Sequence, residues 1–113
     1  MNRGDVVYVD WPFSDRTGSK VRPAVVVQAD FLNTRISDTV LVLISRTHRA
    51  PGHTEVTIDP SIETLSGLRY TSVVSCTNFM TIDKNLVQSK RGELSALAMQ
   101  QIEAALKLAL DLS

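Results

Sequence analysis

The sequence has little cysteine, no excess of either charge and no long apolar run. Its 113 residues include one cysteine, Cys76, so an intramolecular disulfide is excluded and a reducing compartment is indicated. Lys and Arg together number 12, as do Asp and Glu, so nucleic-acid binding would need a local patch. No run approaches the roughly 20 apolar residues of a membrane span, and the N-terminus lacks an apolar signal core. We expect one soluble, cytoplasmic domain spanning residues 1–113.

Short apolar runs separated by polar turns predict a mainly β fold. Residues 30–38 and 60–68 look like irregular connections, with Phe31 and Leu32 packed on the core and a helical turn near 62–65. The run at 39–45 is the most hydrophobic and is expected at the centre of the sheet. The expected strands are 5–10, 21–28, 39–45, 54–58, 71–76 continuing at 79–82 after a bulge, and 86–89.

Residues 94–108 predict one amphipathic helix at the end of the chain, without internal Gly or Pro. Ser95 is the expected N-cap, because its hydroxyl can accept a hydrogen bond from a free N–H of the first turn. Leu94 and Met99 then fall at the positions of a hydrophobic staple. One face collects apolar residues at helical spacing, namely Met99, Ile102, Leu106 and Ala109. Short strands and one terminal helix predict a small, strongly bent sheet or barrel.

Metal and cofactor motifs are absent from the sequence. His48 and His53 are five residues apart with no nearby cysteine, which is not a specific ligand spacing. Cys76 lies inside an expected strand, where a small buried hydrophobe is the commoner role. The chain has neither a phosphate-cradling glycine loop nor a nucleophile elbow. We therefore expect no metal and no cofactor.

One candidate site lies where two expected strands meet. If 21–28 and 39–45 run antiparallel, Arg22 at the start of one and Ser45 at the end of the other share one rim. A guanidinium beside a hydroxyl suits a phosphate group. The alternative is that Arg22 pairs with an acid such as Asp10 and Ser45 only ends its strand. The basic residues after Ser45 (Arg46, His48 and Arg49) lie beside this rim or form a solvated turn.

Two aromatic residues, Trp11 and Phe13, flank Pro12 at the end of the first expected strand. Exposed aromatic rings could stack on nucleobases. Packing against the core is the commoner role at such a position, and we favour it here.

Three segments of this sequence resemble the MazF/PemK (Kid) family of type II toxins. They are GDVVYVD at 4–10 with GSKVRPAVV at 18–26, SVVSCTNFMTIDK at 72–84, and the weaker GELS at 92–95. The resemblance implies a small SH3-like barrel of the MazF/CcdB type and a homodimer. It also implies a sequence-specific, metal-independent endoribonuclease that cleaves single-stranded RNA through the ribose 2′-hydroxyl. The expected products carry 2′,3′-cyclic phosphate and 5′-hydroxyl ends, and a cognate antitoxin occupies the RNA groove.

The same resemblance implies residue roles. The family's Arg-Pro arginine corresponds to Arg22 and its Thr or Ser after the third strand to Ser45, with Thr47 as the alternative. Arg22 would stabilise the phosphorane and Ser45 would bind a non-bridging oxygen. The further residues expected to contact RNA are Ser19, Lys20, Arg46, Arg49 and Asn78.

The sequence departs from the family pattern where a proton acceptor is expected. Residues 18–21 contain no acid, and Ser75 and Thr77 stand where some members have Arg and Asp. His48 or His53 could replace the missing base, because imidazole titrates near neutrality. Otherwise catalysis rests on positioning and charge.

Two other functions fit the same fold class. A CcdB-like toxin would bind DNA gyrase without cleaving RNA, and a small-barrel adaptor would have no toxicity. Fold alone does not separate them from a ribonuclease.

Overall fold

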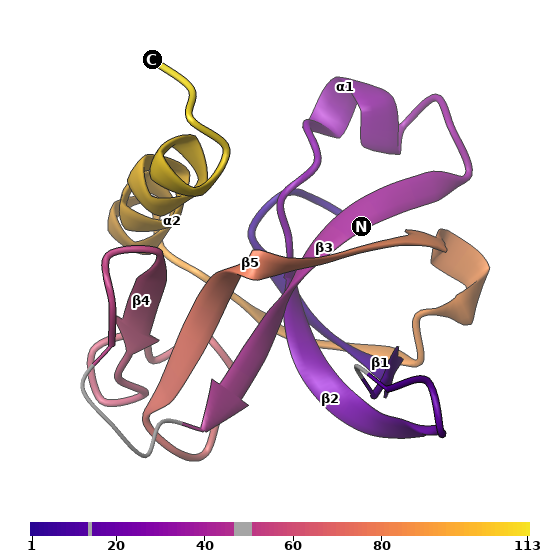
Figure 1. Cartoon of the computed structure of the whole chain (residues 1–113), viewed down its shortest axis with the longest axis horizontal. Coiled ribbons are helices and arrows are strands. Elements are labelled where there is room, and N and C mark those ends of the chain that lie inside the picture. The colour runs from indigo at the N-terminus through magenta and orange to yellow at the C-terminus, as the bar shows by residue number, and fades with distance from the viewer. Residues whose placement is uncertain (14, 47–50) are drawn as a thin grey trace.

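The computed structural model describes residues 1–13, 15–46 and 51–113 of the chain. Within them, one curled antiparallel sheet has the strand order β4-β5-β3-β2-β1-β6, and helix α2 lies beside it (Figure 1). This confirms the predicted β fold with a C-terminal helix and a central third strand. No helix in these ranges is long and apolar enough to cross a membrane. The elements are β1 (Asp5–Pro12), β2 (Ser19–Val26), α1 (Asp30–Asn33), β3 (Asp38–Arg46), β4 (Glu55–Ile58), β5 (Ser72–Asp83), η1 (Lys84–Leu86), β6 (Ser89–Glu93) and α2 (Ala96–Ala109).

The alternation of side chains along the strands builds an apolar cluster on each face of the sheet. One cluster packs against α2 and includes Val6, Val25, Val42, Ile44, Val74, Cys76, Met99 and Ile102. The opposite cluster comprises Val7, Val9, Trp11, Ala24, Val26, Leu41 and Leu43. Trp11 and Cys76 are therefore core residues, as predicted, whereas Phe13 is 41% exposed.

The predicted interruption of β5 is confirmed. Ser75 pairs with Leu43 and Phe79 with Val42, so the three residues between them have no partner in the ladder. Such a bulge bends a strand and re-aims the side chains that follow it. After the bend, Met80 and Ile82 pack on the cluster opposite α2. The bend in β5 thus helps to close the second face.

Two local predictions were wrong. Phe31 is 63% exposed, and the buried residue of α1 is Asn33. The Asn33 side chain accepts hydrogen bonds from Thr39 Oγ1 at 2.8 Å and Gln28 Nε2 at 2.9 Å. These bonds satisfy a polar group inside the fold, which makes its burial acceptable. The strand expected at 86–89 instead runs from Ser89 to Glu93, because residues 84–86 form the 3-10 helix η1, capped by Asp83.

The start of α2 is fixed by the predicted cap and by a connection that the sequence did not reveal. Ser95 Oγ accepts a hydrogen bond from Ala98 N at 3.2 Å. Glu63 accepts from both Ser95 N at 2.8 Å and Ser95 Oγ at 2.6 Å. The segment before β5 is therefore held against the first turn of α2.

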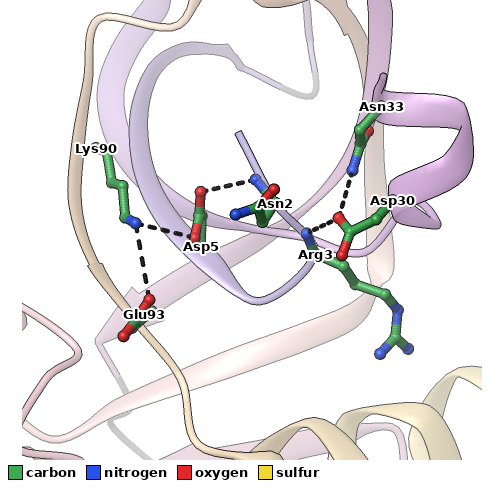
Figure 2. Close-up of polar contacts among 7 residues, drawn as sticks. All are labelled: Asn2, Arg3, Asp5, Asp30, Asn33, Lys90 and Glu93. Atoms are coloured by element: carbon green, nitrogen blue, oxygen red, sulfur yellow. Dashed lines mark hydrogen bonds and ion pairs between the residues drawn. The ribbon is translucent and has the colours of Figure 1, made fainter. Parts of the chain in front are cut away.

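A polar network holds the N-terminal residues in place (Figure 2). Asp5, only 3% exposed, accepts a hydrogen bond from Asn2 N at 2.8 Å and lies 3.3 Å from Lys90 Nζ. Arg3 N donates to Asp30 Oδ1 at 2.7 Å. The network joins the start of β1 to β6 on one side and to α1 on the other.

Candidate functional site

Strands β2 and β3 pair over a short stretch and then separate. Their antiparallel ladder joins Ala24–Val26 to residues 41–43, so the condition for a shared rim at Arg22 and Ser45 is met. Beyond it, β2 stays with β1 as far as Ser19, and β3 stays with β5 as far as Arg46. The start of β2 and the end of β3 diverge in Figure 1. Arg22 and Ser45 each lie two residues beyond the pair formed by Ala24 and Leu43.

A pocket of about 530 Å³ occupies this region of divergence. Its lining includes four cationic side chains and, among the described residues, neither a carboxylate nor an imidazole. A guanidinium presents donors in a planar fork that matches phosphate oxygens. The site therefore suits a phosphate group. The lining residues are Tyr8, Lys20, Arg22, Pro23, Ile44, Ser45, Arg46, Leu68, Arg69, Tyr70 and Ser72.

Arg22 is half-buried on a strand, which fixes its backbone. Within the described ranges its guanidinium forms no ion pair with an acid. Asp10, the alternative partner considered from sequence, instead accepts a hydrogen bond from Gln88 Nε2 at 3.3 Å. The structure thus gives no support to pairing of Arg22 with an acid. Arg22 lines the pocket, and no described side chain accepts a hydrogen bond from it.

An arginine guanidinium lies over the ring of each of the two tyrosines that line the pocket. Arg46 Cζ lies 3.7 Å from the centroid of the Tyr70 ring, and Arg91 Cζ lies 4.8 Å from that of Tyr8. Arg91 is the extra residue of a bulge between β1 and β6, where Val6 pairs with Gly92 and Val7 with Lys90. Both contacts are within the range of a cation–π interaction.

Arg69 and Tyr70 line this pocket although sequence reasoning missed them. They belong to the segment before β5, which looked like an ordinary connection. The only available signal was an Arg-Tyr pair between Gly67 and the strand at 72. Their arrival at the pocket depends on the long-range pairing of Arg46 with Ser72.

The remaining predicted residues are dispersed. Lys20 lines the pocket, whereas Ser19 pairs with Pro12 at the start of β2. Asn78 lies in the bulge of β5 and donates to Ser75 Oγ at 2.7 Å. His53 lines a different groove, between β4 and α2. Thr47, His48 and Arg49 fall outside the described residues.

The thiol of Cys76 takes no part in this pocket. It is fully buried in the cluster under α2. Burial raises its pKa to about 11, because desolvation disfavours the thiolate. No group of three or more His, Cys, Asp or Glu side chains with the geometry of a metal site occurs in residues 1–13, 15–46 and 51–113.

Comparison with known proteins gives consistent matches along the chain. Residues 2–110 match the family described as PemK-like, MazF-like toxin of type II toxin-antitoxin system. Endoribonuclease MazF of Staphylococcus saprophyticus is 32% identical over 115 residues, which cover 99% of this chain and 92% of that protein. A mycobacterial endoribonuclease in complex with its cognate antitoxin has a TM-score of 0.83 at 27% identity, covering 100% and 97% of the two chains. A MazE-MazF complex from Deinococcus radiodurans has a TM-score of 0.74 at 21% identity, covering 100% and 98%, and supports the fold alone.

Proposed function

This chain belongs to the PemK-like, MazF-like toxins of type II toxin-antitoxin systems and is an endoribonuclease toxin, and we propose that it cleaves single-stranded RNA in the pocket between β2 and β3. The observation that carries the proposal is the set of four cations gathered there with the hydroxyl of Ser45 and no described carboxylate. Cytoplasmic messenger RNA is the proposed substrate, cut at a specific short sequence.

The proposed reaction is an internal transfer at phosphorus. The ribose 2′-oxygen attacks the adjacent phosphorus, the bond from phosphorus to the 5′-oxygen breaks, and the attacking hydroxyl loses its proton to solvent. The leaving 5′-oxygen gains a proton from solvent. The products are a 2′,3′-cyclic phosphate and a 5′-hydroxyl. Negative charge grows on the non-bridging oxygens, where Arg22 and Ser45 donate hydrogen bonds.

In this proposal, catalysis depends on the positive charge of the pocket side chains and on how they position the phosphate. Positive side chains neutralise the phosphorane, so the reaction proceeds without a metal ion. The described lining offers no carboxylate or imidazole as base, and His53 belongs to the groove beside α2. We therefore assign His53 no role in proton transfer.

The proposed partners follow from the same pocket. The mycobacterial relative was solved with its cognate antitoxin. A cationic pocket suits an acidic protein segment as well as RNA, so we propose that an antitoxin covers it and blocks cleavage. We also propose a homodimer, which sedimentation of the purified chain will test.

The test compares RNA cleavage by wild type, Arg22→Ala and Ser45→Ala in EDTA. Removing one donor to a developing oxyanion typically costs about 100-fold or more in rate, and we expect that loss for Arg22→Ala. Arg35→Ala, an exposed arginine outside the pocket, and His53→Gln should both cleave at the wild-type rate. A single 2′-deoxy substitution at the cleaved nucleotide should abolish cutting. Wild-type speed in Arg22→Ala would refute the site.

The alternative of a gyrase-binding toxin has no observation in its favour. It would be supported if the purified protein left RNA intact and trapped gyrase on DNA.

A further inference from the structure

Tyr70 presents an aromatic surface at the edge of the pocket. The residue is 56% exposed, yet one face of its ring is covered by the Arg46 guanidinium at 3.7 Å. We propose that Tyr70 is a stacking platform for an unpaired base next to the scissile phosphate. The proposal rests on the ribonuclease function and adds a base-binding residue to it.

The platform is held from the C-terminal side by sheet pairing. Arg46, the last residue of β3, pairs with Ser72, the first residue of β5. Ser72 Oγ donates to the carbonyl oxygen of Tyr70 at 2.8 Å. The guanidinium therefore comes from the end of β3, and the ring lies two residues before the start of β5, the strand paired with β3.

The platform is held from the N-terminal side by close backbone packing. Gly67 has φ +72°, and a Cβ there would overlap the carbonyl oxygen of Arg91. Glu93 N donates to the carbonyl oxygen of Leu65 at 2.8 Å. Residues 65–67, just before Tyr70, thus lie directly on β6. Such pre-organisation reduces the entropy lost when a ligand binds.

An aromatic ring beside a phosphate-binding pocket suits an unpaired nucleobase. Arg46 is engaged with the ring, so its role is to orient Tyr70 and to add positive charge behind it. A base in a duplex has both faces stacked on neighbours, whereas an unpaired base can stack on an aromatic side chain. Arg22 and Ser45 line the same pocket, so a phosphate bound there has its neighbouring base within reach of Tyr70.

The experiment first maps a cleavage site of the wild-type protein on a long single-stranded RNA. A short oligonucleotide with that site is then made uncleavable by one 2′-deoxy nucleotide. In further versions of this oligonucleotide, one nucleotide beside the cleaved bond keeps its sugar and phosphate but has no base. The dissociation constants of all versions are measured for wild type, Tyr70→Ala and Tyr70→Phe. Phe31→Ala removes an exposed aromatic ring that does not line the pocket, and it serves as the matched control.

We expect Tyr70→Ala to weaken binding of the complete oligonucleotide roughly tenfold, the order found for loss of one base-stacking ring. Removal of one particular base should weaken wild type to the same extent and leave Tyr70→Ala unaffected. Tyr70→Phe, which keeps the ring, and Phe31→Ala should behave as wild type. If Tyr70→Ala binds as tightly as wild type, or still responds fully to every missing base, the inference is wrong while the ribonuclease function stands. If wild type cleaves no RNA, the proposed function itself fails, and the inference falls with it.

Discussion

Replacement of Gly67 by alanine should destabilise the fold and disturb the pocket together. Gly67 has a left-handed backbone conformation, and the added Cβ would lie 2.7 Å from the carbonyl carbon of Arg91 as well as overlapping its oxygen. The obstacle is backbone of β6, which cannot rotate away as a flexible side chain would. The segment that carries Tyr70 must therefore move off the sheet.

The magnitude follows from two separate costs. Alanine in a left-handed conformation costs about 1–2 kcal/mol. Moving the segment also weakens the hydrogen bond from Glu93 N to Leu65 O, worth about 1 kcal/mol. We expect a loss of about 2–3 kcal/mol in the free energy of unfolding, which corresponds to a fall of roughly 8–12 °C in Tm for a chain of this size.

The assay is urea unfolding followed by circular dichroism, with Gly52→Ala as the matched control. Among the residues that the structure describes, a Cβ on Gly52 would meet only Glu55 Oε1, at an ordinary contact distance of 3.5 Å. That variant should lie within about 0.5 kcal/mol of wild type. Folded Gly67→Ala should also lose the base dependence assigned to Tyr70. Equal stability of Gly67→Ala and Gly52→Ala would refute this reasoning.

Two further predictions concern the core and α2. Ser95→Ala removes both the cap of α2 and a donor to Glu63, so the free energy of unfolding should fall by about 1–2 kcal/mol in urea titrations; an unchanged midpoint would contradict the capping role. Cys76, with its pKa raised to about 11 by burial, should react with Ellman's reagent at pH 8 only after denaturant is added. The unfolded chain releases the thiol proton first, near the ordinary pKa of 9.0, so this contribution to stability should be complete below pH 9 and disappear as the pH rises towards 11. Prompt labelling of the native protein would disprove the burial argument.

The parts of the fold that depend on local sequence were predictable. The cap at Ser95 is set by residues close together in the chain, and Leu94 and Met99, predicted to form a staple, are both buried in the cluster under α2. The errors concern two features: a buried polar side chain whose hydrogen-bond partners lie elsewhere in the chain, and a strand at the edge of the sheet. Asn33 is buried because Thr39 and Gln28 satisfy it. The strand β6 is polar because it lies at an edge of the sheet, where an apolar pattern is not required.

The part of the candidate site that lies at strand ends was predictable from the sequence, and the rest was not. Arg22 and Ser45 line one pocket because the two neighbouring strands are antiparallel, the condition on which the sequence argument rested. Arg69 and Tyr70 reach the pocket through the register of β5 and the packing of Gly67. Neither of these is encoded in a local motif.

The curvature of the sheet explains why a pocket forms at this position. The second apolar cluster is covered when β5 bends and brings Met80 and Ile82 across it. Beyond the pair of Ala24 with Leu43, strand β3 remains with β5 and β2 remains with β1, so β2 and β3 separate there. The cations at the separated ends lie outside both apolar clusters. Their removal should therefore weaken RNA cleavage without unfolding the protein, and Arg22→Ala should retain the unfolding midpoint of wild type.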